Sequence, residues 1–502
     1  MPGQPTRLGP FNGGLNSLSD PTAVSDSELV DVVNFELDLD GSLTSRPPIT
    51  VEGATPGTES MYLLGYYIAT NGTYYLLGST GTSTYYYTGA WTLLTNTFAA
   101  VAFTQYADKA WLLAGPASAN PGGSWSPSAG FVAVAAMPKG SSIISHKSRL
   151  WVSPGKSATS NGSQLRFSSV TDPTAWDAAK DFLNVNAGDG QNITDIAVVN
   201  NNIMVFKNDS TFVFSYDSGP DKGNVNKISA TQGASDVNCV VQYENTVLVY
   251  HEGNVYEIIN YNFSRISTKV PFTVDNTVPQ QFGTSVAMSL FSDRLIVRHF
   301  DRVYVFNLRT RTWSRWQSDR IFAYFVTEPK NNLITDIPSA YACPAIEDDP
   351  RLFKIQDDFI NGNSEDMTCT FRTKNYDYQI SSNFKKLYWW GADVMAQGEV
   401  NVVANPIVFS FAVTWDQLDL VTWDDLETWD QPLSALPVVT TSVDALGAGN
   451  RKFLKFMKAL RFRQIFFTLS IENDGTPATA PCKVFNLTTF IQTKQGASKE
   501  IS

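Results

Sequence analysis

At 502 residues the chain is long enough for two or three domains, and its 43% apolar and 13% aromatic residues can build large buried cores. The formal net charge of −11 and the pI near 4.9 argue against a surface that grips nucleic acid through its phosphates, because that requires positive potential at the contact. The four cysteines include no Cys-x-x-Cys pair, so their spacing predicts neither a zinc site nor a disulfide framework. Because we find no signal-peptide layout and no apolar run of bilayer length, we expect a soluble protein made in a cytoplasm.

Residues 1–55 are predicted to form an extended N-terminal arm. Ser25 and Glu28 form a capping-box pattern, which predicts a short amphipathic helix that buries Leu29, Val32 and Val33. A small hairpin should follow, turning at Asp40-Gly41. The arm has too few apolar groups to fold alone, so we expect it to dock on a neighbouring copy or along the flank of its own next domain.

Residues 56–360 are predicted to form a β-propeller of six or seven blades. Short runs rich in Val, Ile, Tyr, Phe and Thr alternate with polar turns, and one unit of strand, turn and strand recurs. Its first turns begin at Asn71, Asp108, Ser148, Asn201, Asn245, Asp293 and Asn331. A repeat of roughly 40 to 50 residues with three or four strands is typical of propeller blades, which are stable only against their neighbours. Two stacked β-sandwiches are the alternative.

The repeat stops near residue 361, and residues 361–502 are predicted to form a β-sandwich. The segments "NFKKLYWWGADVMAQGEVNVVANP", "KFMKALRFRQIFFTLSIEN" and "CKVFNLTTFIQTK" each read as alternating strands. The fold class is therefore all-β throughout, with arm, propeller and sandwich in that order.

Three patterns resemble sites of chemistry but lack parts that such sites need. Gly155-Lys156-Ser157 ends like a phosphate-binding loop, but no glycine stands five residues earlier. Asp38, Asp40 and Gly41 resemble part of a calcium loop without its later bidentate acid, so a hairpin is favoured. The three histidines, His146, His251 and His299, fall in three different repeat units, which makes a metal site or triad built from them improbable. We therefore expect no catalytic residue, no cofactor and no metal, although a pair of acids around a propeller axis could serve a glycosidase.

Two local biases remain as candidate contact sites. Thr-Trp-Asp occurs three times, at Trp415, Trp423 and Trp429, and such rings flanked by acids could stack on sugars, although packing of the rings on the sandwich is the favoured interpretation. The segment from Arg451 to Arg463 carries six basic residues and no acid, and Arg461 and Arg463 alternate with apolar neighbours. It could face DNA or an acidic partner, and a contact with the acidic surface of another copy is the simpler interpretation.

The N-terminal segment carries a resemblance to a known class of proteins. "FNGGLN" at residues 11–16 is followed by Asn34 before a strand, by Gly41-Ser42-Leu43 and by Arg46-Pro47. This series resembles the starts of bacteriophage tail proteins of the hub, nozzle or minor tail-tip type. In motif the resemblance covers about 40 residues, and in the order of domains it covers most of the chain.

The resemblance implies a non-enzymatic virion protein. Copies would assemble into a ring at the distal end of the tail, contact adaptor, tube or tip components, and let DNA pass without specific binding. A host-surface glycan-binding adhesin of the tail is the alternative. The residues expected at an interface between copies are Phe11, Asn12, Gly13, Gly14, Leu15, Leu29, Val33, Arg461 and Arg463.

Overall fold

The structure is a computed structural model of the 502-residue chain. It describes residues 5–502 except 58–60, 157, 159–160, 217–218, 221–222, 273–285, 301, 319–321, 330–337, 345–348, 357–366, 377–384, 396–398, 408–441, 444–451, 463, 474–481 and 494–502. The elements of this part are all β-strands. None of the described residues belongs to a helix that is long and apolar enough to cross a membrane.

The chain divides into two compact units. The first, which we call the propeller unit, comprises Ile49–Val305 and Ser318–Asp357. The second, the sandwich unit, comprises Met1–Pro48, Phe306–Gln317 and Asp358–Ser502. The predicted arm is thus grouped with the C-terminal residues, whereas the sequence predicted a separate segment of residues 1–55.

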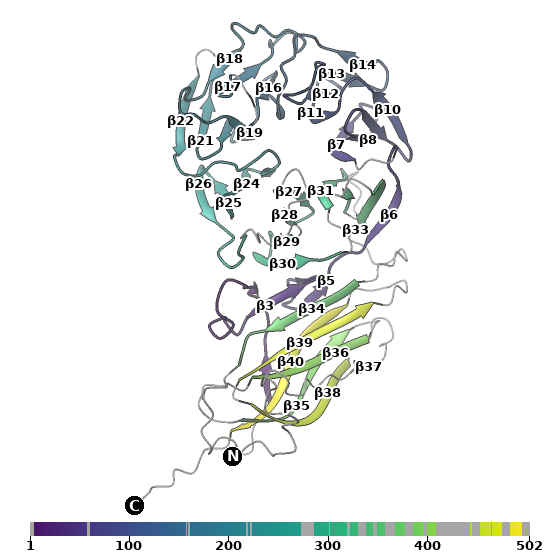
Figure 1. The fold of residues 1–502 in the computed structure, drawn as a ribbon, viewed down its shortest axis with the longest axis vertical. Coiled ribbons are helices and arrows are strands. Elements are labelled where there is room, and N and C mark those ends of the chain that lie inside the picture. The colour runs from purple at the N-terminus through teal and green to yellow at the C-terminus, as the bar shows by residue number, and fades with distance from the viewer. Residues whose placement is uncertain are drawn as a thin grey trace, which may run out of the picture. The chain divides into compact units, whose positions relative to one another are not determined.

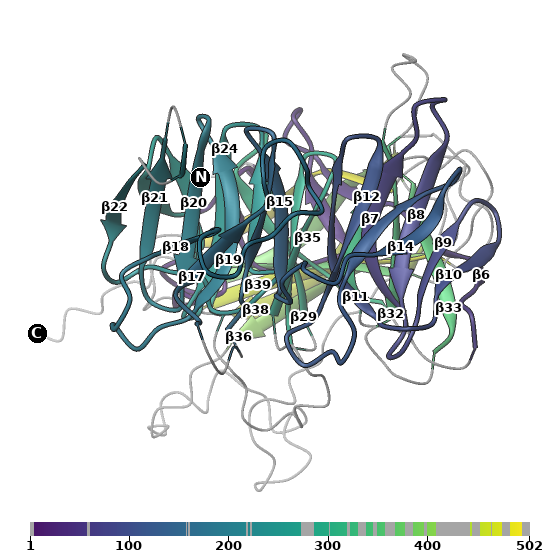
Figure 2. The same cartoon turned by 90° about the horizontal axis from the view of Figure 1, so that it is seen from above.

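The propeller unit is a ring of seven described blades, six of which are separate four-stranded antiparallel sheets, while the strands β27 to β29 of the other blade belong to a larger sheet (Figure 1). The first strand of each blade lies toward the centre of the ring and the last toward its rim, and Figure 2 shows the blades edge-on. The first three blades are β7 (Tyr62–Ile68), β8 (Tyr74–Ser79), β9 (Thr84–Tyr87) and β10 (Trp91–Thr95); β11 (Ala100–Tyr106), β12 (Lys109–Ala114), β13 (Gly123–Ser126) and β14 (Gly130–Ala133); and β15 (Ser142–His146), β16 (Arg149–Ser153), β17 (Gln164–Phe167) and β18 (Phe182–Asn184).

The remaining blades continue the ring. They are β19 (Ile193–Val199), β20 (Asn202–Lys207), β21 (Thr211–Ser215) and β22 (Asn224–Ser229); β23 (Val240–Tyr243), β24 (Thr246–His251), β25 (Asn254–Ile259) and β26 (Asn262–Arg265); β27 (Val286–Phe291), β28 (Arg294–His299) and β29 (Arg302–Asn307); and β31 (Phe322–Thr327), β32 (Ser339–Pro344) and β33 (Arg351–Gln356) with β6 (Ile49–Ala54).

The predicted turns lie where the first two strands of each blade are joined. Six of the seven fall on such a connection, and the seventh, at Asn331, is outside the described residues. In the fourth blade Asn200 and Asn201 both have positive φ, 48° and 61°, as a two-residue hairpin turn requires. The prediction of a propeller is therefore confirmed, and stacked sandwiches are excluded for this region.

The apolar cores of the propeller lie between neighbouring blades. One buried cluster joins Trp151 and Leu165 of the third blade to Val205 and Phe214 of the fourth. Comparable clusters join the first blade to the second and the second to the third. A blade therefore buries its two faces only against its neighbours, as the repeat predicted.

The ring is closed by the N-terminal strand β6. It pairs antiparallel with β33, with Ile49 opposite Ile355 and Val51 opposite Phe353, and completes the last blade from the start of the chain. A further cluster, which includes Leu63 of the first blade and Leu352 of the last, packs across this closure. Residues 49–54, predicted as part of the arm, thus belong to the propeller.

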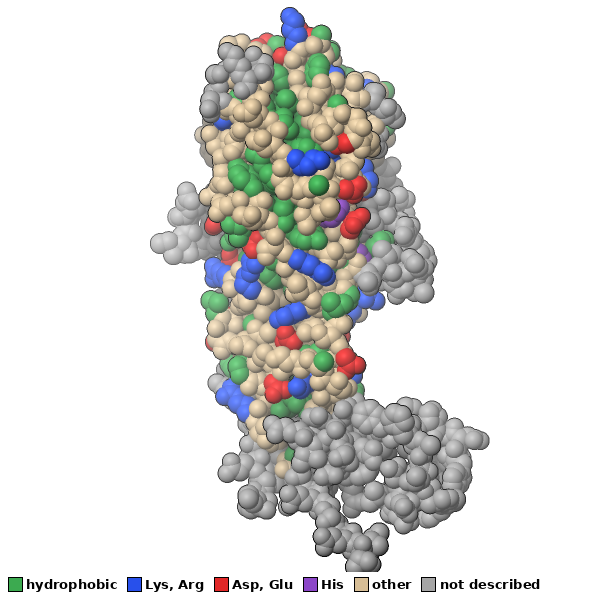
Figure 3. Space-filling view, turned by 90° about the vertical axis from the view of Figure 1, so that its left-hand side faces the viewer, with side chains coloured by type: hydrophobic (Ala, Val, Ile, Leu, Met, Phe, Trp, Pro, Cys, Tyr) green, Lys and Arg blue, Asp and Glu red, His purple; other side chains and the backbone are tan. Residues whose placement is uncertain are grey.

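The surface shown in Figure 3 is mixed in charge. Lysine and arginine side chains lie singly among uncharged ones, with acidic side chains interspersed, and apolar side chains form a broken stripe. Where described side chains cover this face, they form no extended patch of one sign.

The sandwich unit consists of strands from both ends of the chain. One sheet has the order β38-β35-β40-β5-β4 with β1 beside β40, and the other includes β30-β3-β34-β39-β36-β37 with β2 beside β3. Phe35 of the first sheet and Phe371 of the second meet with ring centroids 6.0 Å apart. The strands are β1 (Pro5–Leu8), β2 (Gly14–Leu15), β3 (Glu28–Val33), β4 (Phe35–Leu37), β5 (Leu43–Ser45), β30 (Thr312–Trp316), β34 (Met367–Thr373), β35 (Lys385–Met395), β36 (Glu399–Ile407), β37 (Ser442–Val443), β38 (Lys452–Phe462), β39 (Gln464–Asn473) and β40 (Lys483–Thr493).

The predicted helix after Ser25 is wrong, because Glu28–Val33 is the strand β3. Glu28 does accept a hydrogen bond from the Ser25 backbone N–H at 3.2 Å, as in a capping box. The Glu28 N–H, however, closes a turn onto the Ser25 carbonyl, and the following residues pair with β34. Long-range pairing thus overrides the local signal, and the β-branched Val32 and Val33 favour a strand.

The predicted hairpin at Asp40-Gly41 is confirmed. Strands β4 and β5 pair antiparallel, with Leu37 opposite Leu43, and Gly41 has a φ of 82°. The carboxylate of Asp38 lies 2.8 Å from Nζ of Lys483. In the segment that resembles part of a calcium loop, Asp38 is therefore paired with a lysine.

Candidate functional site

One face of the propeller carries the candidate site. It is the face of the turns between the second and third strands of each blade and of the connections from one blade to the next. On it lies a cavity of about 400 Å³. Its lining residues are Lys156, Ser235, Asp236, Cys239, Tyr250, Glu252, Gly253, Phe272, Val286 and Phe300.

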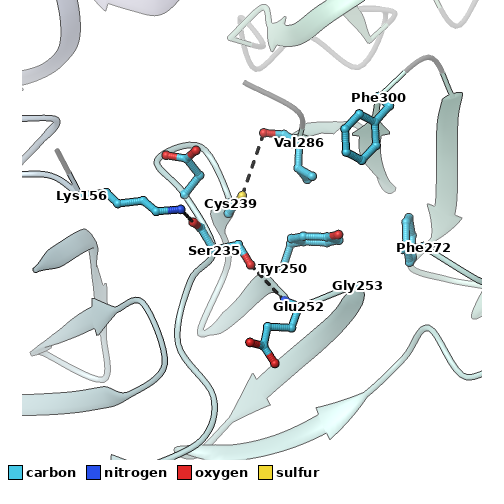
Figure 4. A pocket seen from close by; sticks show the side chains of 10 residues that line it. Lys156, Ser235, Cys239, Tyr250, Glu252, Gly253, Phe272, Val286 and Phe300 are labelled. Atoms are coloured by element: carbon cyan, nitrogen blue, oxygen red, sulfur yellow. Dashed lines mark hydrogen bonds between the residues drawn. The ribbon is translucent and has the colours of Figure 1, made fainter. Parts of the chain in front are cut away.

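Aromatic rings form one wall of the cavity (Figure 4). Tyr250 at the end of β24 meets Phe272 edge to face, with ring centroids 5.9 Å apart. Phe300, in the turn after β28, contacts the ring of His299 with centroids 4.7 Å apart. Tyr250 and Phe272 are only 5% and 4% exposed, so the partly exposed Phe300 offers most of the accessible ring surface, and such a ring can pack against the apolar face of a sugar.

The opposite wall is polar and internally bonded. Nζ of Lys156 donates to the Ser235 carbonyl at 2.6 Å, and Oγ of Ser235 accepts the Glu252 backbone N–H at 3.0 Å. Lys156 of the Gly155-Lys156-Ser157 pattern thus lies in this wall, where it bonds to a backbone carbonyl. In Figure 4 the Glu252 carboxylate points away from the Tyr250 ring.

Cys239 and Asp195 lie buried at the back of this region. Burial raises the pKa of the Cys239 thiol to about 12, helped by the negative charges of Asp236 and Asp195, so the thiol is not an activated nucleophile. Burial also raises the pKa of Asp195 to about 6, against hydrogen bonds from the Ser142 side chain and two backbone N–H groups.

A buried ion pair stabilises the same face one blade away. Lys207 at the end of β20 has a fully buried side chain, and its Nζ lies 2.8 Å from both carboxylate oxygens of Asp189. It also donates to Oγ of Ser163 and to the Asn186 carbonyl, both at 3.1 Å. Burial opposes ionisation of Asp189, but the hydrogen bonds from Lys207, Gln191 and Asn186 outweigh it and lower its pKa. Lys207 therefore stabilises the connection between the third and fourth blades.

The three histidines do not come together, as the sequence indicated. His146 ends β15 at the opposite face, and His299 and His251 end β28 and β24. His251 instead lies beside two acids, Asp209 and Glu252, and the ligating atoms of these three residues lie within 4.8 Å of one another. The sequence did not single out this group, because Asp209 and His251 come from different blades.

The N-terminal motif forms a second feature, a buried polar cluster in the sandwich unit that we call the Asn34–Arg46 cluster. Arg46 is 0% exposed, and its Nε donates to Oδ1 of Asn34 at 2.9 Å. Its NH1 and NH2 groups donate to the carbonyls of Pro47 and Gln317 at 2.9 and 3.1 Å. Asn34, held at a φ of 58°, accepts the Gln317 N–H at 2.7 Å and donates to the Thr368 carbonyl at 2.9 Å. Three distant stretches of the chain thus meet at the motif.

The residues predicted for an interface between copies are mostly buried within the sandwich unit itself. Phe11, Leu15, Leu29 and Val33 are at most 5% exposed, so their side chains are covered by the chain and not left for a neighbour. A Cβ on Gly13 would meet Glu28 and one on Gly14 would meet Thr312, so both glycines allow close packing within the unit.

The other predicted contact residues have different outcomes. Asn12 is exposed and stays available to a partner. Arg461 lies in β38, where its side chain is not described, and Arg463 lies outside the described residues. Trp415, Trp423 and Trp429 also lie outside them, so their proposed glycan contact stays a prediction.

The sequence matches no described protein family and no curated protein. Among solved structures it is similar to virginiamycin B lyase from Staphylococcus aureus, at 8% identity over 62% of this chain and 99% of that chain, with a TM-score of 0.42. It is also similar to the Pan2 WD40 domain of Neurospora crassa, at 9% identity over 60% and 97% with a TM-score of 0.39. A third is PorZ, a surface component of the type-IX secretion system of Porphyromonas gingivalis, at 9% identity over 67% and 44% with a TM-score of 0.40. These likenesses extend to the fold alone.

Proposed function

We propose that the chain is a structural component of a bacteriophage tail, assembled as a ring of copies in a distal nozzle, hub or tip. In the virion it would contact adaptor, tube or tip components and let DNA pass during ejection. The proposal assigns the chain no catalytic step.

The observation that supports the proposal is the Asn34–Arg46 cluster. The residues that carry the resemblance to tail proteins are the ones that join β3, β5, β30 and β34 of the sandwich unit. An arginine that satisfies three acceptors in a buried site is not interchangeable with lysine, because only its planar fork reaches them together. Asn34 and Arg46 of the motif therefore have a structural role in this unit, and a shared motif with such a role favours a shared architecture.

The pairing of strands that are distant in the sequence also suits a part that carries mechanical force. The first and last strands of the sandwich unit are paired, with Pro5 opposite Phe490 and Leu8 opposite Leu487. The propeller is closed by a strand that precedes its first blade. A protein with a formal net charge of −11 would hold passing DNA weakly.

Imaging of the purified full-length chain by negative-stain electron microscopy tests the proposal. We expect rings with one rotational symmetry, and antibodies against the chain should label the distal end of phage tails. A chain that stays monomeric at all concentrations and is absent from purified virions would contradict it.

The aromatic wall of the cavity supports a second candidate, a glycan-binding adhesin of the tail. Binding of the purified chain to host-surface glycans, lost on Phe300→Ala and kept on mutation of an exposed residue such as Val132→Ala, would favour this function. Equal binding by both variants would place any glycan contact elsewhere on the chain.

A further inference from the structure

Asp209, His251 and Glu252 bring three metal-ligating groups together on the face of the propeller that carries the cavity. Asp209 lies in the turn between β20 and β21 of the fourth blade. His251 is the last residue of β24 in the fifth blade, and Glu252 begins the next turn. The ligating atoms, one from each residue, lie within 4.8 Å of one another, so small rotations of the side chains would let a single ion contact all three.

His251 is the member of this group that points to a ligand. Its side chain is 4% exposed, its Nε2 lies 3.9 Å from Oε2 of Glu252, and its buried Nδ1 has no hydrogen-bond partner. Buried imidazole nitrogens are normally bonded, so this ring lacks a polar contact that folded proteins usually supply. Nε2 is the ring nitrogen that lies near Glu252, so an ion held by the two carboxylates would bind the ring there.

The backbones that carry the two acids are held in place. The Asp209 N–H donates to Oε1 of Gln191 at 3.1 Å, and Oδ1 of Asp209 accepts from Asn208 at 2.9 Å. Glu252 has a φ of 43° and is followed by Gly253 at 76°, a tight turn in which its N–H is bonded to Ser235. Binding would therefore order little more than side chains, which keeps its entropic cost low.

Two lysines on this face are engaged elsewhere and so do not neutralise the two acids. Nζ of Lys207 is held by Asp189, and Nζ of Lys156 is held by the Ser235 carbonyl. The carboxylates of Asp209 and Glu252 thus lie beside the imidazole of His251 and not beside either lysine.

We propose that Asp209, His251 and Glu252 bind one divalent transition-metal ion of the zinc class. One imidazole and two carboxylates suit Zn²⁺, Co²⁺ or Mn²⁺, whereas Ca²⁺ and Mg²⁺ prefer oxygen ligands alone. Three protein ligands leave at least one coordination position for water or for an oxygen of a bound ligand. Because Glu252 also lines the cavity, the ion lies at the cavity rim and joins the fourth blade to the fifth. This site is independent of the proposed role in a tail.

Metal content and affinity of the full-length chain test this proposal. The chain is stripped with a chelator, dialysed against Zn²⁺ at pH 7.5, and measured by elemental mass spectrometry and calorimetry. We expect one tightly bound ion per chain, with an affinity at least about tenfold lower in Asp209→Asn and in Glu252→Gln. Glu252 has a 76% exposed side chain, so its variant should fold even if a change at buried His251 does not.

Two controls separate this site from other binding. His146→Gln changes another buried histidine, in β15, and should leave stoichiometry and affinity unchanged. The Co²⁺-loaded chain should show no sulfur-to-cobalt charge-transfer band, since its four cysteines are buried. Zinc content that is absent, or unchanged in both acid variants, would overturn the proposal, as would a strong sulfur band.

Discussion

Asp195 shows how the chemistry behind the cavity affects stability. It lies in β19, 7% exposed, with its Oδ1 bonded to the Ile196 N–H at 2.8 Å. Because burial raises its pKa from 3.8 to about 6, the folded state holds a proton that the unfolded state releases at lower pH. Its contribution to stability is therefore fully present below pH 3.8 and is lost as the pH rises through about 6.

Asp195→Asn should remove this pH dependence. In the wild-type chain the contribution of Asp195 to the free energy of unfolding should fall by about 2 kcal/mol between pH 4 and pH 7, from the raised pKa. The difference between variant and wild type, followed by chemical denaturation at several pH values, should favour the variant progressively above pH 5. Asp172→Asn is the control, because hydrogen bonds from Thr174 lower the pKa of that exposed acid. A pH-independent difference for Asp195→Asn would contradict the linkage.

At the scale of the element, β6 decides whether the ring is closed. It is paired on one side with β33, so its only described sheet partner is the blade that it completes. Ile49 in this strand is 7% exposed and Val51 is 53% exposed. Substitutions at these two positions therefore compare a buried and an exposed side chain of the same strand.

Ile49→Ala should destabilise the propeller and Val51→Ala should not. We expect a loss of about 2–4 kcal/mol for the buried residue, since a cavity is left between strand and blade, and a change within about 0.5 kcal/mol for the exposed one. Thermal unfolding of the two variants measures the difference. Equal effects would mean that β6 does not close the ring in solution.

The strands and turns of the propeller could be predicted from the sequence because their signals are local. Runs such as Ile193–Val199 and Asn202–Lys207 alternate with polar turns, and asparagine tolerates the positive φ that the turn at Asn200 and Asn201 needs. In most blades the predicted start of the turn lies one residue from the first residue of the observed connection. The strand β3 could not be predicted in this way, because its partner β34 lies more than 330 residues away and the local pattern at Ser25 favours a helix.

The candidate site was not predictable by the same means. The proposed ligands Asp209 and His251 are separated in the sequence by the strands β21 to β24, and Lys156 of the cavity comes from the third blade. A usable signal existed in the repeat itself, since polar residues such as Lys207, His251 and His299 end the second strand of three successive blades. Aligning the repeats by their turns would have placed these residues at one face of the ring.

At the scale of the whole molecule, the sandwich unit interleaves the two ends of the chain. Strands β1 and β5 pair with β40, and β3 pairs with β34, so residues 5–45 are paired with residues 367–493. The propeller is inserted between these partners in the sequence. The sandwich unit can therefore complete its sheets only after almost the whole chain has been made, whereas propeller hairpins form from neighbouring strands.

Deletion of residues 1–48 should consequently unfold the sandwich unit and spare the propeller. The truncated chain keeps β6, so the last blade remains closed, but β34 and β40 lose partners and Phe371 loses the rings of Phe11 and Phe35. Hydrogen exchange read by mass spectrometry should show lost protection in residues 464–473 and retained protection in residues 193–207. Deletion of residues 482–493, which removes β40, should affect the sandwich unit in the same way. Full protection of residues 464–473 after removal of the arm would show that the sandwich unit folds without it. That result would reject the role of the arm in the sandwich unit and favour the prediction that the arm docks on a neighbouring copy or on the propeller flank.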